Sequence, residues 1–174
     1  MILYILIFVN RMYDNIYVDL VVQHIYDQYI QCWFHTILNA TKLDTYCLFK
    51  TNFVFEPYID LIDNRLHRIA FTRIRLSSHR LAIEEGRFRN IERNNRICRC
   101  CTMNVIENEY HFVLVCPFYR SIRSELLPRY FCSWPTIYKF KTLFQSRQAG
   151  LIKKLATFVY LSYLKRSGKN SIVR

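Results

Sequence analysis

Four of the chain's seven cysteines and one of its five histidines fall between Cys98 and Cys116. Cys98 and Cys101 are two residues apart, His111 follows after nine more and Cys116 after another four, which gives the spacing C-x2-C-x9-H-x4-C. Structural zinc binds thiolate and imidazole ligands in tetrahedral geometry, usually as two close pairs joined by a longer loop. We therefore expect a structural Zn²⁺ bound by Cys98, Cys101, His111 and Cys116.

The remaining cysteine of the cluster, Cys100, competes poorly for the ion because adjacent or C-x-C pairs suit a tetrahedral ion less well than C-x2-C. We assign Cys100 to packing beside the site. On a regular helix Cys116 would point away from His111, but the residue before a proline leaves the helical region, so Pro117 allows a bend back toward the ion. The alternative is an apolar core segment beside a chance cluster of cysteines.

A run of ten arginines without a lysine leads into the cluster, from Arg65 to Arg99, and three glutamates leave it a local charge of +7. Arginine binds phosphate oxygens in a bidentate manner and stacks on bases, so the run favours contact with a nucleic-acid backbone. The alternative is that individual arginines pair with acidic side chains elsewhere. The candidate nucleic-acid-binding residues are Arg73, Arg75, Arg80, Arg87, Arg89, Arg93, Arg96 and Arg99.

The elements that position these residues are expected to be helices. Hydrophobic residues make up 52% of the 174 positions, which predicts a packed fold, and three glycines and four prolines disfavour a many-turned β fold. Apolar residues follow helical spacing from Asn15 to about Thr41, and Leu66, Ile69, Ala70 and Ile74 form one apolar face of a second helix. A short helix is expected to end at Gly86.

The fold class is therefore mostly α, an irregular helical domain of five to seven helices with a small zinc-knuckle-like Cys3His module. Four regions follow from the sequence, all within one expected domain. They are an apolar N-terminal segment (1–13), a helical, arginine-rich region (14–92), the Cys/His zinc-binding module (93–128) and the C-terminal helices (129–174).

The net charge of +12 indicates a polyanionic partner, and we expect RNA or DNA rather than a membrane or a small-molecule substrate. The apolar run from Met1 to Val9 is about half the roughly 20 residues that span a bilayer, and it lacks the features of a secretion signal. We expect an intracellular protein, where clustered cysteines bind metal more often than they form disulfides, and the nucleic-acid partner favours the nucleus.

The stretches SSHRLAIEEGRFRNIERNNRICRCC and ENEYHFVLVCPFYRSIR resemble the C-terminal region of reverse transcriptases from LINE-type (non-long-terminal-repeat) retrotransposons. In that family a Cys/Cys/His/Cys module follows the polymerase, and its second half commonly reads E-x-E-Y-H-F-L-L-x-C-P-x-Y. The resemblance spans about Phe71 to Arg123. It places the four expected ligands at the family's ligand positions and Cys100 at a variable one.

The resemblance implies a module that helps to hold template RNA or target DNA beside a reverse transcriptase polymerase domain. Reverse transcription needs clustered aspartates for two metal ions, and no two aspartates are adjacent in this chain. We therefore expect no enzymatic activity and no catalytic residues. The leading hypothesis is a zinc-stabilised nucleic-acid-binding module. The alternatives are a protein-interaction domain that docks the polymerase or another partner, and a retroelement remnant without a selected activity.

Overall fold

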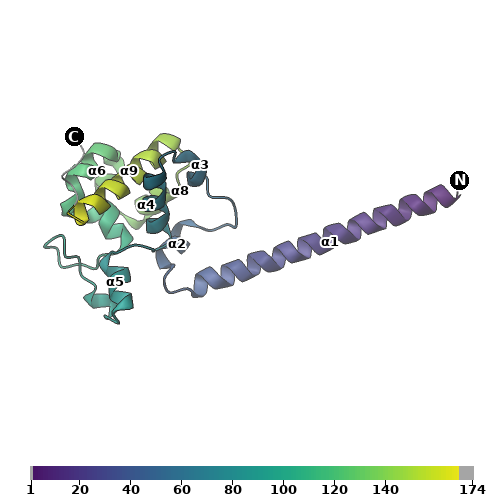
Figure 1. Ribbon diagram of the computed structural model, residues 1–174, viewed down its shortest axis with the longest axis horizontal. Helices are drawn as coiled ribbons and strands as arrows, with labels where there is room; N and C mark the ends of the chain where they lie inside the picture. The colour runs from purple at the N-terminus through teal and green to yellow at the C-terminus, as the bar shows by residue number, and fades with distance from the viewer. Residues whose placement is uncertain (1, 169–174) are drawn as a thin grey trace. The chain divides into compact units, whose positions relative to one another are not determined.

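The computed structural model describes the backbone of residues 2–168 and the side chains of residues 16–168. Most of these residues are helical, and the β structure among them is limited to one antiparallel bridge between Ile97 and Ile106 (Figure 1). The expected mostly helical fold is therefore confirmed. Within the same residues, no helix combines the length and apolar character needed to cross a bilayer.

The chain divides into two compact units, with the boundary between Ala40 and Thr41. The first unit contains a single long helix, α1 (Ile2–Asn39), and the expected boundary between residues 13 and 14 falls inside it. Ile16, Leu20 and Ile25 are all more than half exposed on this helix. A helix with apolar side chains around its circumference is normally covered by other protein, so α1 presents an unusual surface.

The second unit contains the other helices and the Cys/His cluster. Its elements are α2 (Asp44–Phe49), α3 (Tyr58–Leu61), α4 (Arg65–Arg75), α5 (Ala82–Phe88), η1 (Arg93–Asn95), η2 (His111–Val115), η3 (Pro117–Tyr119), α6 (Arg120–Leu126), α7 (Arg129–Cys132), α8 (Ile137–Gln145) and α9 (Ala149–Arg166). In the described part of the chain the helices outnumber the five to seven expected. Elements as short as α3 and α7, with four residues each, show no periodic pattern in a sequence.

The core of the second unit forms where α4 and α9 pack side by side (Figure 1). Phe158 and Val159 of α9 and Ile74 of α4 are fully buried there. The ring of Phe112, which belongs to η2, stacks on Tyr163 of α9 with 5.4 Å between the centroids. The last helix therefore anchors both the core and the segment that carries the Cys/His cluster.

The buried face of α4 is rotated from the expected one. Ala70 and Ile74 are buried as predicted, but Leu66 and Ile69 are exposed and Phe71 takes their place in the core. Phe71 is almost completely buried and its ring stacks on Phe144. Two apolar residues on α4 therefore remain at the surface.

Gly86 does not end a helix, because α5 continues to Phe88. The glycine is required by close packing instead. A Cβ atom at this position would lie 2.6 Å from Cγ of Arg96, well inside van der Waals contact. The Arg96 guanidinium is fixed by donation to the carbonyl oxygens of Ile83 and Ile91, at 2.8 and 3.0 Å, so this side chain joins α5 to the loop that enters the cluster.

Candidate metal centre and basic surface

The first two candidate ligands lie on a narrow loop closed by backbone hydrogen bonds. Ile97 and Ile106 form the antiparallel bridge, and the Cys98 amide donates to the Val105 carbonyl at 2.9 Å. Asn104 turns the chain with a φ of 52°, a conformation that asparagine tolerates better than most residues. The loop therefore folds as a knuckle that holds Cys98 and Cys101 on one side.

The second ligand pair depends on a π-helical turn, η2. The Cys116 amide donates to the His111 carbonyl at 2.7 Å, five residues back, whereas an α-helix uses a four-residue step. The wider turn places Cys116 above His111, on the same side of the backbone. The bend at Pro117 expected from the sequence follows this turn, with Cys116 in an extended conformation, but the π turn already aligns the two ligands.

Polar side chains secure both ends of η2. At the start, the Asn108 Oδ1 atom accepts from the His111 amide at 2.8 Å. At the end, the buried Arg123 guanidinium donates to the carbonyl oxygens of Val113 and Cys116 at 2.7 and 2.8 Å. Sequence reasoning missed both residues, because neither belongs to the candidate ligand set and the Arg123 contacts span up to eleven residues.

The ligand atoms of Cys98, Cys101, His111 and Cys116 all lie within 4.8 Å of one another. The Sγ atoms of Cys98 and Cys116 are 4.0 Å apart, and Sγ of Cys101 lies 3.5 Å from Nε2 of His111. Sulfurs at about 2.3 Å from a tetrahedral zinc would be separated by about 3.8 Å. The side chains thus have the spacing of a tetrahedral site, and the expected four-member cluster is confirmed.

Burial shifts the titration of three of the cluster's side chains. It raises the pKa of the Cys98 and Cys116 thiols, which keeps them protonated unless a bound cation stabilises the thiolates. Burial also lowers the pKa of His111, which favours the neutral imidazole that ligates metals. Nδ1 of His111 is buried without a hydrogen-bond partner among the described residues, and Nε2 is the nitrogen that faces the thiols.

Cys100 stands outside this group. The Cys100 sulfur, the Cys98 sulfur and the Glu107 carboxylate form a second close group. In that group the guanidinium of Arg166 already provides a positive charge. Nη1 of Arg166 donates to Sγ of Cys100 at 3.1 Å and also to Oε1 of Glu107. The Tyr119 hydroxyl lies 3.7 Å from the same sulfur. Cys100 therefore packs beside the four-ligand cluster, as expected.

Glu107 and Glu109 serve as buried hydrogen-bond acceptors. The Glu107 carboxylate accepts from Arg166 Nη2 at 2.9 Å and from the Ala82 amide at 2.7 Å, which joins the knuckle to α9 and to the start of α5. Glu109 accepts from Ser77 at 2.7 Å and from His79 at 2.9 Å. The E-x-E pair therefore ties the segment before His111 to the chain between α4 and α5.

Two of the eight predicted nucleic-acid-binding arginines are directed inward. Arg75 is buried, donates to the Phe144 carbonyl and pairs with Glu56, both at 2.8 Å, and its guanidinium carbon lies 4.4 Å from the centre of the Phe49 ring. Arg96 fixes the Gly86 contact described above. Both guanidinium groups donate to backbone carbonyl oxygens, so neither Arg75 nor Arg96 is available to bind a phosphate.

Three further arginines form ion pairs near the surface. Arg87 pairs with Glu84 at 2.9 Å within α5, and Arg89, the residue after α5, pairs with Glu85 at 2.5 Å. Arg93 pairs with Asp44 at 2.9 Å. Glu84 is buried, whereas the Arg89 and Arg93 pairs are solvent-exposed and contribute little to stability.

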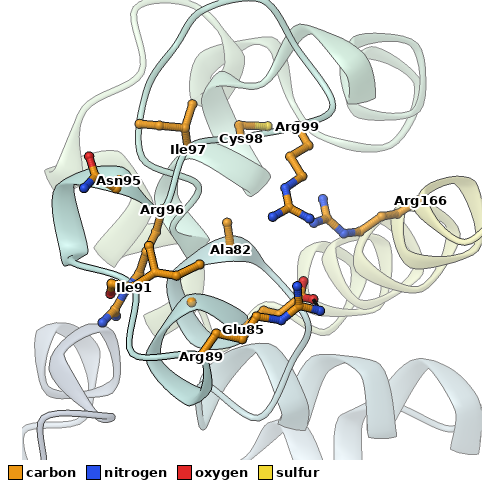
Figure 2. A pocket seen from close by; sticks show the side chains of 11 residues that line it. Ala82, Glu85, Arg89, Ile91, Asn95, Arg96, Ile97, Cys98, Arg99 and Arg166 are labelled. Atoms are coloured by element: carbon orange, nitrogen blue, oxygen red, sulfur yellow. Dashed lines mark hydrogen bonds and ion pairs between the residues drawn. The ribbon is translucent and has the colours of Figure 1, made fainter.

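Arg73, Arg80 and Arg99 are exposed, and within the described residues none of them forms an ion pair. Arg99 and Cys98 both line a small hollow of about 160 Å³. In Figure 2 the guanidinium group of Arg99 points toward that of Arg166. The candidate phosphate contacts thus reach the edge of the Cys/His cluster.

No protein-family model, curated protein or solved structure compared with the chain matches it.

Proposed function

We propose that this chain is a zinc-stabilised nucleic-acid-binding module, derived from the C-terminal region of a LINE-type reverse transcriptase. The observation that carries the proposal is the convergence of three thiols and one imidazole within 4.8 Å. Soft sulfur ligands with one imidazole, at tetrahedral spacing, select Zn²⁺ over hard cations such as Mg²⁺ or Ca²⁺.

The zinc has a structural role in this proposal. Four protein ligands complete its tetrahedral shell, so no position is open for a catalytic water. The two ligand pairs lie on separate segments, the knuckle and the π turn, and the ion joins them. In zinc-finger peptides such a site contributes roughly 10–16 kcal/mol of binding free energy to folding.

Nucleic acid is the partner that best matches the charge of the chain. The net charge is +12, and binding one Zn²⁺ to three thiolates lowers it only to +11. Arg73, Arg80 and Arg99 present exposed guanidinium groups, and Arg99 adjoins the cluster. Such groups bind phosphate oxygens through paired hydrogen bonds.

The test is the salt dependence of binding. Fluorescence anisotropy with labelled RNA and DNA should give a log K that falls linearly with log [salt], since each phosphate contact releases counterions. A flat dependence, or no binding at low salt by protein that contains zinc, contradicts the nucleic-acid proposal.

The surface of α1 favours a second candidate, a protein-interaction domain that docks a polymerase or another partner. Ile16, Leu20 and Ile25 are more than half exposed, and a helix with so much exposed apolar surface is normally covered by another protein segment. Light scattering distinguishes this candidate. A monomer that stays soluble at high concentration contradicts it, and salt-independent self-association supports it.

A further inference from the structure

The second unit carries a groove of about 900 Å³ between α4, α5 and α9. Four basic residues line it, and Glu85 is the single acidic residue among its described lining residues. The Glu85 carboxylate is already neutralised by Arg89 at 2.5 Å. The four basic residues are Lys42, Arg73, Arg80 and Arg166. The groove therefore has a net positive lining that suits an anionic ligand.

Two of these cations are available to a ligand. Arg73 and Arg80 are exposed and have no ion-pair partner in the described part of the chain. Arg166 is held by Glu107, which fixes its position. Guanidinium groups in these positions would bind a phosphate backbone that runs along the groove.

The same groove presents flat and apolar surface beside its cations. Phe88 is 77% exposed, and the guanidinium carbon of Arg87 lies 4.9 Å from the centre of its ring. Leu66 and Ile69, the α4 residues left out of the core, line the groove as well. A free phosphate would make no use of this surface, whereas a base stacks on an exposed aromatic ring.

The groove continues toward the metal cluster. The small hollow in Figure 2 shares Glu85 and Arg166 with the groove, so the two adjoin. That hollow is also lined by Arg99 and Cys98. A strand that lay along the groove would thus reach a further unpaired arginine at the knuckle, which the zinc holds in place.

We propose that this groove binds single-stranded nucleic acid, with Arg73 and Arg80 on the phosphates and Phe88 stacked on a base. This inference rests on the proposed function and makes it specific, because only unpaired bases leave a face free for Phe88. A duplex keeps its bases stacked and offers the groove phosphates alone.

The experiment compares two variants of the full chain with two matched controls, all loaded with zinc. Phe88→Ala is set against Tyr138→Ala, an aromatic residue that is 71% exposed on α8 and lies outside the groove. The double substitution Arg73→Gln, Arg80→Gln is set against Arg147→Gln, an exposed arginine of a different hollow. The ligands are a labelled 12-mer RNA, a 12-mer single-stranded DNA and a DNA duplex of the same length.

We expect the unaltered chain to bind both single strands more tightly than the duplex. Phe88→Ala should weaken single-strand binding by roughly tenfold, as loss of one stacked base does, and leave duplex binding unchanged. The double arginine variant should lower the salt slope for single strands by about 1.4, since each phosphate contact contributes about 0.7. Both controls should bind as the unaltered chain does.

Two results overturn the groove assignment while leaving nucleic-acid binding intact. One is equal affinity for single strands and duplex with no effect of Phe88→Ala. The other is a salt slope that the double substitution Arg73→Gln, Arg80→Gln leaves unchanged. That result would favour a protein as the partner that binds the groove. If no salt-dependent binding to any of the three ligands is detected, the proposed nucleic-acid-binding function itself is contradicted. Circular dichroism and zinc content check that each variant is folded.

Discussion

Cys116 lies five residues after His111 and nevertheless faces the same ion position, which regular helical geometry would not allow. The π turn resolves this, because its five-residue hydrogen bond stacks the two residues. Arg123 then satisfies the carbonyl oxygens of Val113 and Cys116. π turns of this kind are frequently found at functional sites, which fits a turn that aligns two candidate ligands.

In this cluster, Cys98→Ser should abolish zinc binding, whereas Cys100→Ser should have little effect. Serine is a poor zinc ligand, so Cys98→Ser should abolish stoichiometric zinc and with it folding free energy on the order of 10 kcal/mol. Cys100 accepts hydrogen bonds from Arg166 and Tyr119, which a hydroxyl also accepts, so its serine variant should stay within about 1 kcal/mol of the unaltered chain. Metal analysis and urea denaturation measure both effects. Equal zinc loss in the two variants would contradict the assignment of Cys100.

The grouping of Cys98, Cys101, His111 and Cys116 could be predicted because their spacing in the sequence is local and is typical of a tetrahedral metal site. The roles of the arginines were less predictable, because charge alone does not reveal whether a side chain points into the core or toward solvent. Arg75 follows Phe71 by one helical turn and so shares its buried face, whereas Arg73 points to the surface. The four-residue step from Phe71 to Arg75 could have predicted that Arg75 is buried. The predicted apolar face of α4 did not include Phe71, so this step was not recognised.

At the scale of elements, Glu107 is the contact that joins the knuckle, α5 and α9. Its side chain is completely buried, and its partner Arg166 comes from the end of the last helix. Residues 59 apart leave no trace of their pairing in the spacing of a sequence. For this reason the ion pair between Glu107 and Arg166 could not be predicted from the sequence.

Glu107→Gln should therefore destabilise the chain far more than Glu85→Gln. Removing one partner of a buried ion pair leaves the other charge uncompensated, at a cost of about 3–5 kcal/mol. Glu85 pairs with Arg89 at the surface, where a pair contributes at most about 1 kcal/mol. Urea denaturation of the zinc-loaded variants measures the difference. Similar losses in both would show that the Glu107 pair does not hold these elements together.

Gly86→Ala tests the packing of α5 against the loop that enters the cluster. The new Cβ would lie 2.6 Å from the Arg96 side chain, whose guanidinium is fixed by two carbonyl oxygens. Overpacking of this kind costs about 1–3 kcal/mol.

The matched control for this substitution is Gly150→Ala in α9, where the added Cβ has no atom within 4 Å apart from its chain neighbours and the nearby backbone of its own helix. There the loss of backbone freedom in the unfolded chain should stabilise the protein by up to about 1 kcal/mol. Thermal denaturation should thus move in opposite directions for the two variants. A neutral or stabilising Gly86→Ala would contradict the close contact.

At the scale of the whole molecule, composition predicted the mostly helical class but not how the helices divide. Apolar periodicity predicted a helix from Asn15 to about Thr41, but it did not show that this helix continues through the apolar N-terminal segment to Ile2. The division at Ala40 and the groove between α4, α5 and α9 depend on which faces meet. Contacts between distant segments set those faces, and a single sequence does not encode them as a visible pattern.

The account depends most on the proposed zinc, which would stabilise the second unit and hold Arg99 in position for nucleic-acid binding. The most direct measurement is elemental analysis of the full chain, produced with zinc in the medium and purified under reducing conditions without chelator or histidine tag. We predict one zinc per chain, lost together with the Cys/His segment's ordered structure when a strong chelator is added. A folded protein with no metal above background would contradict the account.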